Sequence, residues 1–103
     1  MKLVRDFIPQ IIKESGKSCE YYVASTHEYK KYLYEKMHEE LDEFFENPCY
    51  EEAADMYEVL SAICFLHDMT MELVKDTARN KRKKRGGFTD KIILEKVINK
   101  NQR

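Results

Sequence analysis

The fold depends most on residues 34–66, which read YEKMHEELDEFFENPCYEEAADMYEVLSAICFL. Within this stretch and just before it, apolar residues recur at the spacing of one helix face, at Leu33, Met37, Leu41 and Phe44. Asn47 and Pro48 then interrupt the pattern, as a helix end followed by a turn does. We therefore expect a long helix over about residues 27–46.

The second half of the stretch is apolar on nearly every side. Of the 14 residues from Ala53 to Leu66, 11 are apolar, and they cover most of the circumference of a helix. We expect a helix over about residues 50–67 that is largely buried. Because the turn before it is short, this helix and the preceding one should lie antiparallel.

The sequence before the long helix predicts a short helix and a connection. Apolar spacing and a following Gly16 predict a helix over residues 5–15. The aromatic residues after it predict an extended segment over residues 17–24. Ser25 and Glu28 then form the S-x-x-E pattern of a capping box, which marks the start of the long helix.

The sequence after residue 67 predicts one more helix. Asp68 or Thr70 can cap it, and Gly86 and Gly87 can end it after Arg85. Residues 88–103 fit either an extended segment or a short helix. The fold class expected is therefore all-α, a bundle of about four helices that forms a single domain over residues 1–103.

The composition excludes several classes of protein. Among 103 residues, 43% are hydrophobic and 36% charged, with 3 Gly and 2 Pro, which excludes collagen-like and low-complexity chains. No run approaches the ~18 apolar residues that span a bilayer, and the start MKLVRDFIPQ is unlike a signal peptide. The three cysteines contain no CxxC pair, which is typical of reduced thiols. We expect a soluble cytoplasmic protein with no membrane contact.

Positive and negative charges are segregated along the chain. From Glu28 to Glu58 there are 11 acidic and 3 basic residues, and from Lys75 to Arg103 there are 11 basic and 3 acidic residues. This pattern predicts an acidic surface and a separate basic one, of which the basic one can bind an anion.

The acidic residues are paired at helical spacing in both central helices. Glu40 borders the apolar stripe of the first, and Glu43 follows one turn later, so both carboxylates can reach one point. The second, apolar helix carries Glu52, Asp55 and Glu58. Because two carboxylates ~4 Å apart repel by about 4 kcal/mol at an effective dielectric constant of ~20, a positive partner is expected among them.

A divalent cation is the simplest such partner. Two antiparallel helices with an acid pair each can supply about four oxygen ligands, which favour Mg²⁺ or Mn²⁺. The alternatives are solvated acidic faces, or salt bridges to Lys and Arg of other helices. A di-iron bundle needs Glu-x-x-His on two helices, and the sequence has one instance, Glu35 to His38.

Three motifs together resemble a known enzyme family. EELDE at residues 39–43 and EEAAD at residues 51–55 are similar to the EExxE and ExxD motifs of MazG-like nucleotide pyrophosphohydrolases. KLVRDFIPQII at residues 2–12 and KRKKRGGF at residues 81–88 resemble the phosphoribosyl-ATP pyrophosphohydrolase-like branch of that superfamily.

The resemblance implies an all-α oligomer, a homodimer or homotetramer, that hydrolyses a nucleoside triphosphate between its α and β phosphates. It implies Mg²⁺ as cofactor, with Mn²⁺ as a substitute. Glu39 would orient or deprotonate the attacking water. The metal ligands it implies are Glu40, Glu43, Glu52 and Asp55.

The basic stretch over residues 79–85 has three interpretations. It can be a solvated helix end whose cations suit the helix dipole, or a nucleic-acid patch, although it lacks interleaved aromatic residues. In a pyrophosphohydrolase it would contact the triphosphate, and the substrate contacts expected are then Lys81, Lys84, Arg85 and, more weakly, Arg5. A non-enzymatic nucleic-acid or partner-binding module that uses this stretch is the alternative function.

Overall fold

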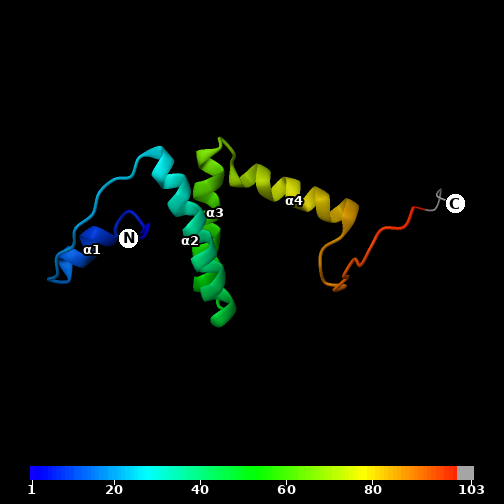
Figure 1. The fold of residues 1–103 in the computed structure, drawn as a ribbon, viewed down its shortest axis with the longest axis horizontal. Coiled ribbons are helices and arrows are strands. Elements are labelled where there is room, and N and C mark those ends of the chain that lie inside the picture. Colours follow the sequence, from blue (N-terminus) through cyan, green and yellow to red (C-terminus); the bar gives the residue numbers. More distant parts are fainter. Residues whose placement is uncertain (100–103) are drawn as a thin grey trace. The chain divides into compact units, whose positions relative to one another are not determined.

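A computed structural model of the chain describes residues 1–99 and contains four helices (Figure 1). They are α1 (Ile8–Glu14), α2 (Thr26–Glu46), α3 (Tyr50–Leu66) and α4 (Met71–Arg85). Over residues 1–99 the structure has no β-strand, so the predicted all-helical class is confirmed. Among the helices of these residues, none is both long enough and apolar enough to cross a membrane.

The chain divides into two compact units, Met1–Met71 and Glu72–Arg103. The first unit contains α1, α2 and α3. The second contains α4 beyond its first residue and the segment that follows it. The single domain expected over residues 1–103 stays a prediction.

The start of the long helix α2 is fixed by a capping residue. The hydroxyl of Ser25 accepts a hydrogen bond of 3.2 Å from the backbone N–H of Glu28, as a capping residue should. The Glu28 carboxylate accepts a hydrogen bond of 2.9 Å from the Tyr22 hydroxyl, which raises the pKa of Tyr22 to about 12. This contact attaches the connecting segment 17–24 to the start of α2.

The helices α2 and α3 form the packed pair of the first unit (Figure 1). Their connection is three residues long, 47–49, so they run antiparallel, as predicted. Among the described residues, the buried apolar side chains are Leu33 of α2 and Val59 and Cys64 of α3. These buried side chains show that the first half of α2 lies against the second half of α3.

The prediction that α3 is largely buried is wrong for this chain. Phe65 is 82% exposed, and Tyr57 and Leu60 are exposed as well. Because α2 packs against one side of α3, the apolar residues on the other sides of α3 remain accessible to solvent. The outcome is a small core with a broad apolar surface.

The first helix is shorter than the predicted 5–15. A helix that started at residue 5 would place the Pro9 ring against the Arg5 carbonyl, so α1 begins at Ile8, with Pro9 in its first turn. Gly16 ends it as predicted, with φ of +87°, and the backbone N–H of Lys17 donates to the Ile12 carbonyl at 3.3 Å. Residues 1–7 are left as a non-helical N-terminal segment.

The second unit follows the sequence closely. Helix α4 starts after Thr70, ends at Arg85, and is followed by Gly86 with φ of +81°. Residues 88–99 form neither helix nor strand. The rest of the segment that the sequence left open, residues 100–103, lies outside the described part of the chain.

Candidate metal centre

Acidic side chains of α2 and α3 gather where the two helices meet. Each residue of one group, Glu39, Glu40 and Glu43, offers a carboxylate oxygen within 4.8 Å of those of the other two. The same holds for a second group, Glu40, Glu52 and Asp55. Glu40 belongs to both groups, and the five residues are called the acidic cluster below.

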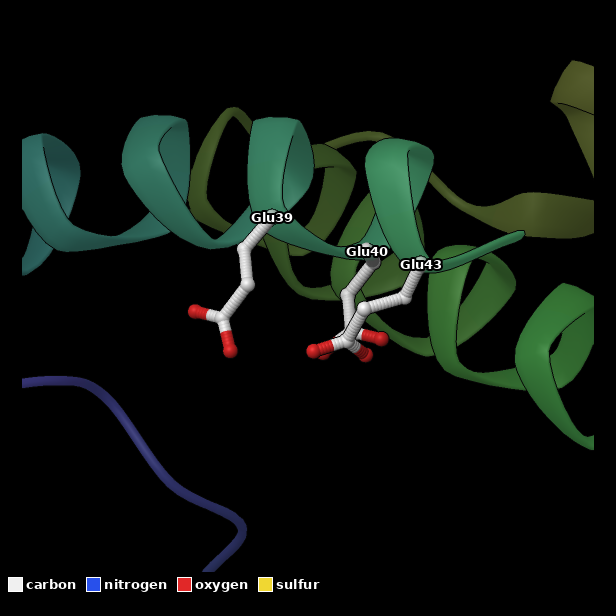
Figure 2. Close-up of side chains that lie close together, drawn as sticks. All are labelled: Glu39, Glu40 and Glu43. Carbon is white, nitrogen blue, oxygen red and sulfur yellow. The ribbon is translucent and has the colours of Figure 1, made fainter. Parts of the chain in front are cut away.

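Figure 2 shows how the α2 members of the acidic cluster lie. The Glu40 and Glu43 side chains converge, and Glu39 extends on the same side of the helix. This follows from the i, i+3 spacing of Glu40 and Glu43, which places them one turn apart on one face. The structure thus brings together the five acids to which the resemblance assigns the roles of ligand and base, and these roles stay predictions. Glu58, which the sequence also singled out on the second helix, belongs to neither group.

Glu40 is the buried charged residue of the described chain, at 4% exposure. Its Oε1 lies 3.2 Å from Lys36 Nζ, but its Oε2 is buried and has no hydrogen-bond partner among the described residues. The same is true of Glu52 Oε2, on the facing helix. A buried acceptor without a donor costs about 1–3 kcal/mol, and more when charged, so a cation would stabilise this arrangement.

The negative charge of the cluster acts on Glu43. The pKa of Glu43 is raised, chiefly by the charge of Glu40, with smaller contributions from Glu52 and Glu39. A raised carboxyl pKa means that the ionised form is disfavoured by its neighbours. The same repulsion favours binding of a positive ion.

One side-chain cation of α2 contacts the cluster. Lys36 Nζ lies 3.2 Å from Glu40 Oε1 and 3.5 Å from Glu39 Oε1. Burial lowers the pKa of Lys36, and the two glutamates outweigh this, so its pKa is raised overall. Lys36 sits one turn before Glu40, so the i, i+4 spacing was the signal that could have found this contact.

A second cation comes from the N-terminal segment. Arg5 Nη2 lies 2.6 Å from Asp55 Oδ1, and this hydrogen-bonded ion pair raises the pKa of Arg5. Lys2 Nζ lies 3.6 Å from Glu39 Oε1. The sequence assigned Arg5 to substrate, and the structure places it on a predicted metal ligand. Salt bridges to the cluster therefore form, but their cations come from α2 itself and from the N-terminal segment and not from other helices. The two oxygens of Glu40 and Glu52 named above have no donor among residues 1–99.

The residues fit a hard divalent cation. All the available donor atoms are carboxylate oxygens, the ligands that Mg²⁺ and Mn²⁺ prefer. Two of these oxygens, on facing helices, are buried and have no partner within the described part of the chain. The donor set contains no His or Cys, which disfavours zinc and iron.

A cavity of about 760 Å³ adjoins the acidic cluster. Its polar lining includes Arg5, Glu40 and Asp55, and its apolar lining includes Leu33 and Ala62. Residues of the N-terminal segment and of α1 complete the wall. The volume lies in the range that binds small molecules, and no motif in the sequence indicated which apolar residues would line it.

Three of the basic residues predicted to bind substrate belong to the second unit. Lys81, Lys84 and Arg85 are exposed on α4, in the second unit. Four basic residues occupy the last turn of the helix, where cations suit the dipole. Their assignment as substrate contacts stays a prediction.

Comparisons of the chain with protein-family models, with curated proteins and with solved structures find no match. Function is therefore inferred from the side chains and the cavity described above.

Proposed function

We propose that this protein is a Mg²⁺-dependent nucleotide pyrophosphohydrolase of the MazG-like type. It hydrolyses a nucleoside triphosphate between the α and β phosphates and releases a nucleoside monophosphate and pyrophosphate. The observation that supports this most is that Glu40 and Glu52 each have a buried oxygen with no partner among residues 1–99, in a cluster whose Glu40 and Asp55 line a cavity of about 760 Å³. The motif resemblance of residues 2–12, 39–55 and 81–88 supplies the reaction type.

Each group of side chains at the site has a separate role in this reaction. Glu40, Glu43, Glu52 and Asp55 would hold Mg²⁺, which when bound would supply positive charge to neutralise phosphate oxygens and to lower the pKa of water. Glu39 is less buried than Glu40 and accepts the proton of the attacking water. Lys36 lies between the Glu39 and Glu40 carboxylates and fixes their separation. The apolar wall of the cavity excludes water from the rest of the nucleotide.

A panel of nucleoside triphosphates with Mg²⁺ tests this function by the release of pyrophosphate. We expect turnover with at least one triphosphate, loss of turnover with EDTA, and monophosphate and pyrophosphate in equal amounts. Release of orthophosphate instead would place the cleaved bond elsewhere. Absence of turnover with every member of the panel would contradict the proposal.

The basic end of α4 gives the first further prediction. Replacing Lys84 and Arg85 by Gln should lower kcat/KM at least tenfold, roughly 1.4 kcal/mol, because charge-assisted hydrogen bonds to the triphosphate are lost. Stability should change by no more than about 1 kcal/mol, since both residues are exposed. Kinetics and thermal melting of the double variant check this.

A matched control removes two exposed cations from another place, with Lys13→Gln and Lys17→Gln, and should keep normal kinetics. Normal kinetics in the Lys84 and Arg85 variant would return residues 79–85 to a solvated helix end. Salt-dependent binding of duplex DNA by the natural protein, without pyrophosphate release, would favour the nucleic-acid alternative instead.

The exposed apolar surface predicts that the active unit is an oligomer, a homodimer or homotetramer. In the described residues, three apolar side chains are buried, while Phe65 of α3 and Phe45 of α2 are 82% and 75% exposed. A second copy of the chain can cover this surface. Light scattering at micromolar concentration should show more than one chain per particle.

Two substitutions at one position make this prediction specific. Phe65→Glu should shift the particle toward the monomer, because a charge cannot be buried there without a partner, and Phe65→Leu should not. A monomeric natural protein with full activity would contradict the prediction.

A further inference from the structure

The N-terminal segment, residues 1–7, contacts the acidic cluster through two cations. Arg5 Nη2 lies 2.6 Å from Asp55 Oδ1, and Lys2 Nζ lies 3.6 Å from Glu39 Oε1. Figure 2 shows this segment passing the side of α2 on which the three glutamates extend. Arg5 and Asp55 are 50 positions apart in the sequence, so their contact joins distant parts of the first unit.

Arg5 and a metal ion would use the same carboxylate. Asp55 offers an oxygen within 4.8 Å of those of Glu40 and Glu52, which is the group expected to hold Mg²⁺. The guanidinium already occupies Asp55 Oδ1. Two cations at one carboxylate repel each other, so each lowers the affinity of the site for the other.

The unsatisfied oxygens show that Arg5 compensates the cluster only in part. Glu40 is 4% exposed, and its Oε2 and that of Glu52 have no partner in the described chain. The Arg5 and Asp55 side chains are 56% and 38% exposed, so solvent screens their pairing. A divalent ion in the cluster can bind the buried oxygens of Glu40 and Glu52 as well as Asp55, whereas Arg5 binds Asp55. The ion therefore neutralises more of the negative charge than the guanidinium does and can displace it from Asp55.

The N-terminal segment also forms part of the cavity wall. The cavity is lined by every residue from Lys2 to Ile8 together with residues of α2 and α3. In this non-helical segment, the ion pairs of Lys2 and Arg5 are the charged contacts to the helices. Release of Arg5 would therefore loosen one wall of the cavity.

We propose that Arg5 acts as an internal counter-cation which holds the N-terminal segment against the acidic cluster without metal and is released when Mg²⁺ binds. Metal binding and the position of the cavity wall are then coupled, and in the metal-free protein residues 1–7 act as a strap that is held in the wall of the cavity. This proposal rests on the metal site of the proposed function and adds a regulatory step to it.

The coupling is tested by metal binding and by a probe on the strap. The chain contains no tryptophan, so Phe7→Trp introduces a single one, at a position that is 77% exposed. Calorimetry gives the Mg²⁺ affinity, and fluorescence anisotropy gives the mobility of the strap. We expect saturating Mg²⁺ to lower the anisotropy. Adding Arg5→Gln should lower the anisotropy without Mg²⁺, remove its response to Mg²⁺, and tighten Mg²⁺ binding at least fivefold.

Matched variants separate competition at Asp55 from a general charge effect. Lys2→Gln removes one cation of the same segment and should tighten Mg²⁺ binding less than twofold, while Arg5→Lys keeps the charge and should fall between the natural protein and Arg5→Gln. Equal tightening by Lys2→Gln and Arg5→Gln would overturn the proposal. So would an anisotropy that saturating Mg²⁺ leaves unchanged.

The outcomes also separate this proposal from the function on which it rests. Mg²⁺ binding that loosens the strap, without hydrolysis of any triphosphate, would support the coupling and reject the enzyme. Hydrolysis of a triphosphate by a protein whose strap mobility does not change with Mg²⁺ would support the enzyme and reject the coupling. Absence of Mg²⁺ binding in both the natural protein and Arg5→Gln would reject both.

Discussion

Replacing Glu40 with Gln is expected to abolish pyrophosphate release while the helices remain folded. Glu40 is shared by both oxygen groups of the acidic cluster, so its loss removes a ligand from each. We expect kcat/KM to fall at least a hundredfold, which corresponds to about 2.7 kcal/mol of transition-state stabilisation. Steady-state kinetics with circular dichroism as a measure of folding check this.

The same substitution elsewhere on α2 provides the control. Glu46 is exposed at the end of the helix and lies outside both oxygen groups, so Glu46→Gln should keep normal activity. Asp55→Asn, on the facing helix, should behave like Glu40→Gln. If either cluster variant keeps most of its activity, the assignment of metal ligands is wrong.

The second large effect expected is stabilisation of the fold by Mg²⁺. Ions that bind the folded chain and not the unfolded one add about 2.7 kcal/mol at a concentration one hundred times the dissociation constant. For a protein of this size, that free energy corresponds to a rise in melting temperature on the order of 10 °C. Thermal melting with Mg²⁺ and with EDTA measures the difference.

Glu40→Gln should remove this response to Mg²⁺ without loss of stability in EDTA. The reason is that the substitution removes a buried charge whose Oε2 has no partner and relieves the repulsion that raises the pKa of Glu43. The melting temperature of the metal-free variant should therefore equal or exceed that of the natural chain. A melting temperature of the natural chain that millimolar Mg²⁺ leaves unchanged would count against the site.

The helices could be predicted because their ends are encoded locally. Ser25 caps α2, Asn47 and Pro48 end it, and Gly86 follows α4, so each boundary depends on residues within one turn of it. The acid pairs could be located for the same reason, since i, i+3 spacing fixes their face. The antiparallel arrangement of α2 and α3 then brings the two pairs together.

The counter-cations of the cluster were harder to predict. Lys36 was within reach of sequence reasoning, because it precedes Glu40 by four residues on one helix. Arg5 was not, because its partner Asp55 is 50 residues away and the contact depends on how a non-helical segment lies on two helices. No local pattern encodes such a contact.

The burial of α3 was overestimated for a related reason. Composition gives the total apolar area of a helix but not the number of neighbours that cover it. Val59 and Cys64 face α2 and are buried, whereas Phe65, next to Cys64 in the sequence, is 82% exposed. A helix that is apolar nearly all round is more than one short chain easily covers, which is also the reason to expect an oligomer.

The presence of a divalent cation in the acidic cluster is the claim on which the proposed function depends most. Crystals of the natural protein soaked with Mn²⁺ and measured at the manganese absorption edge would locate the ion directly. We predict an anomalous peak at about 2.0–2.5 Å from carboxylate oxygens of Glu40, Glu52 and Asp55. Crystals in saturating Mn²⁺ with no peak at these residues, and with Arg5 still paired to Asp55, would contradict the account.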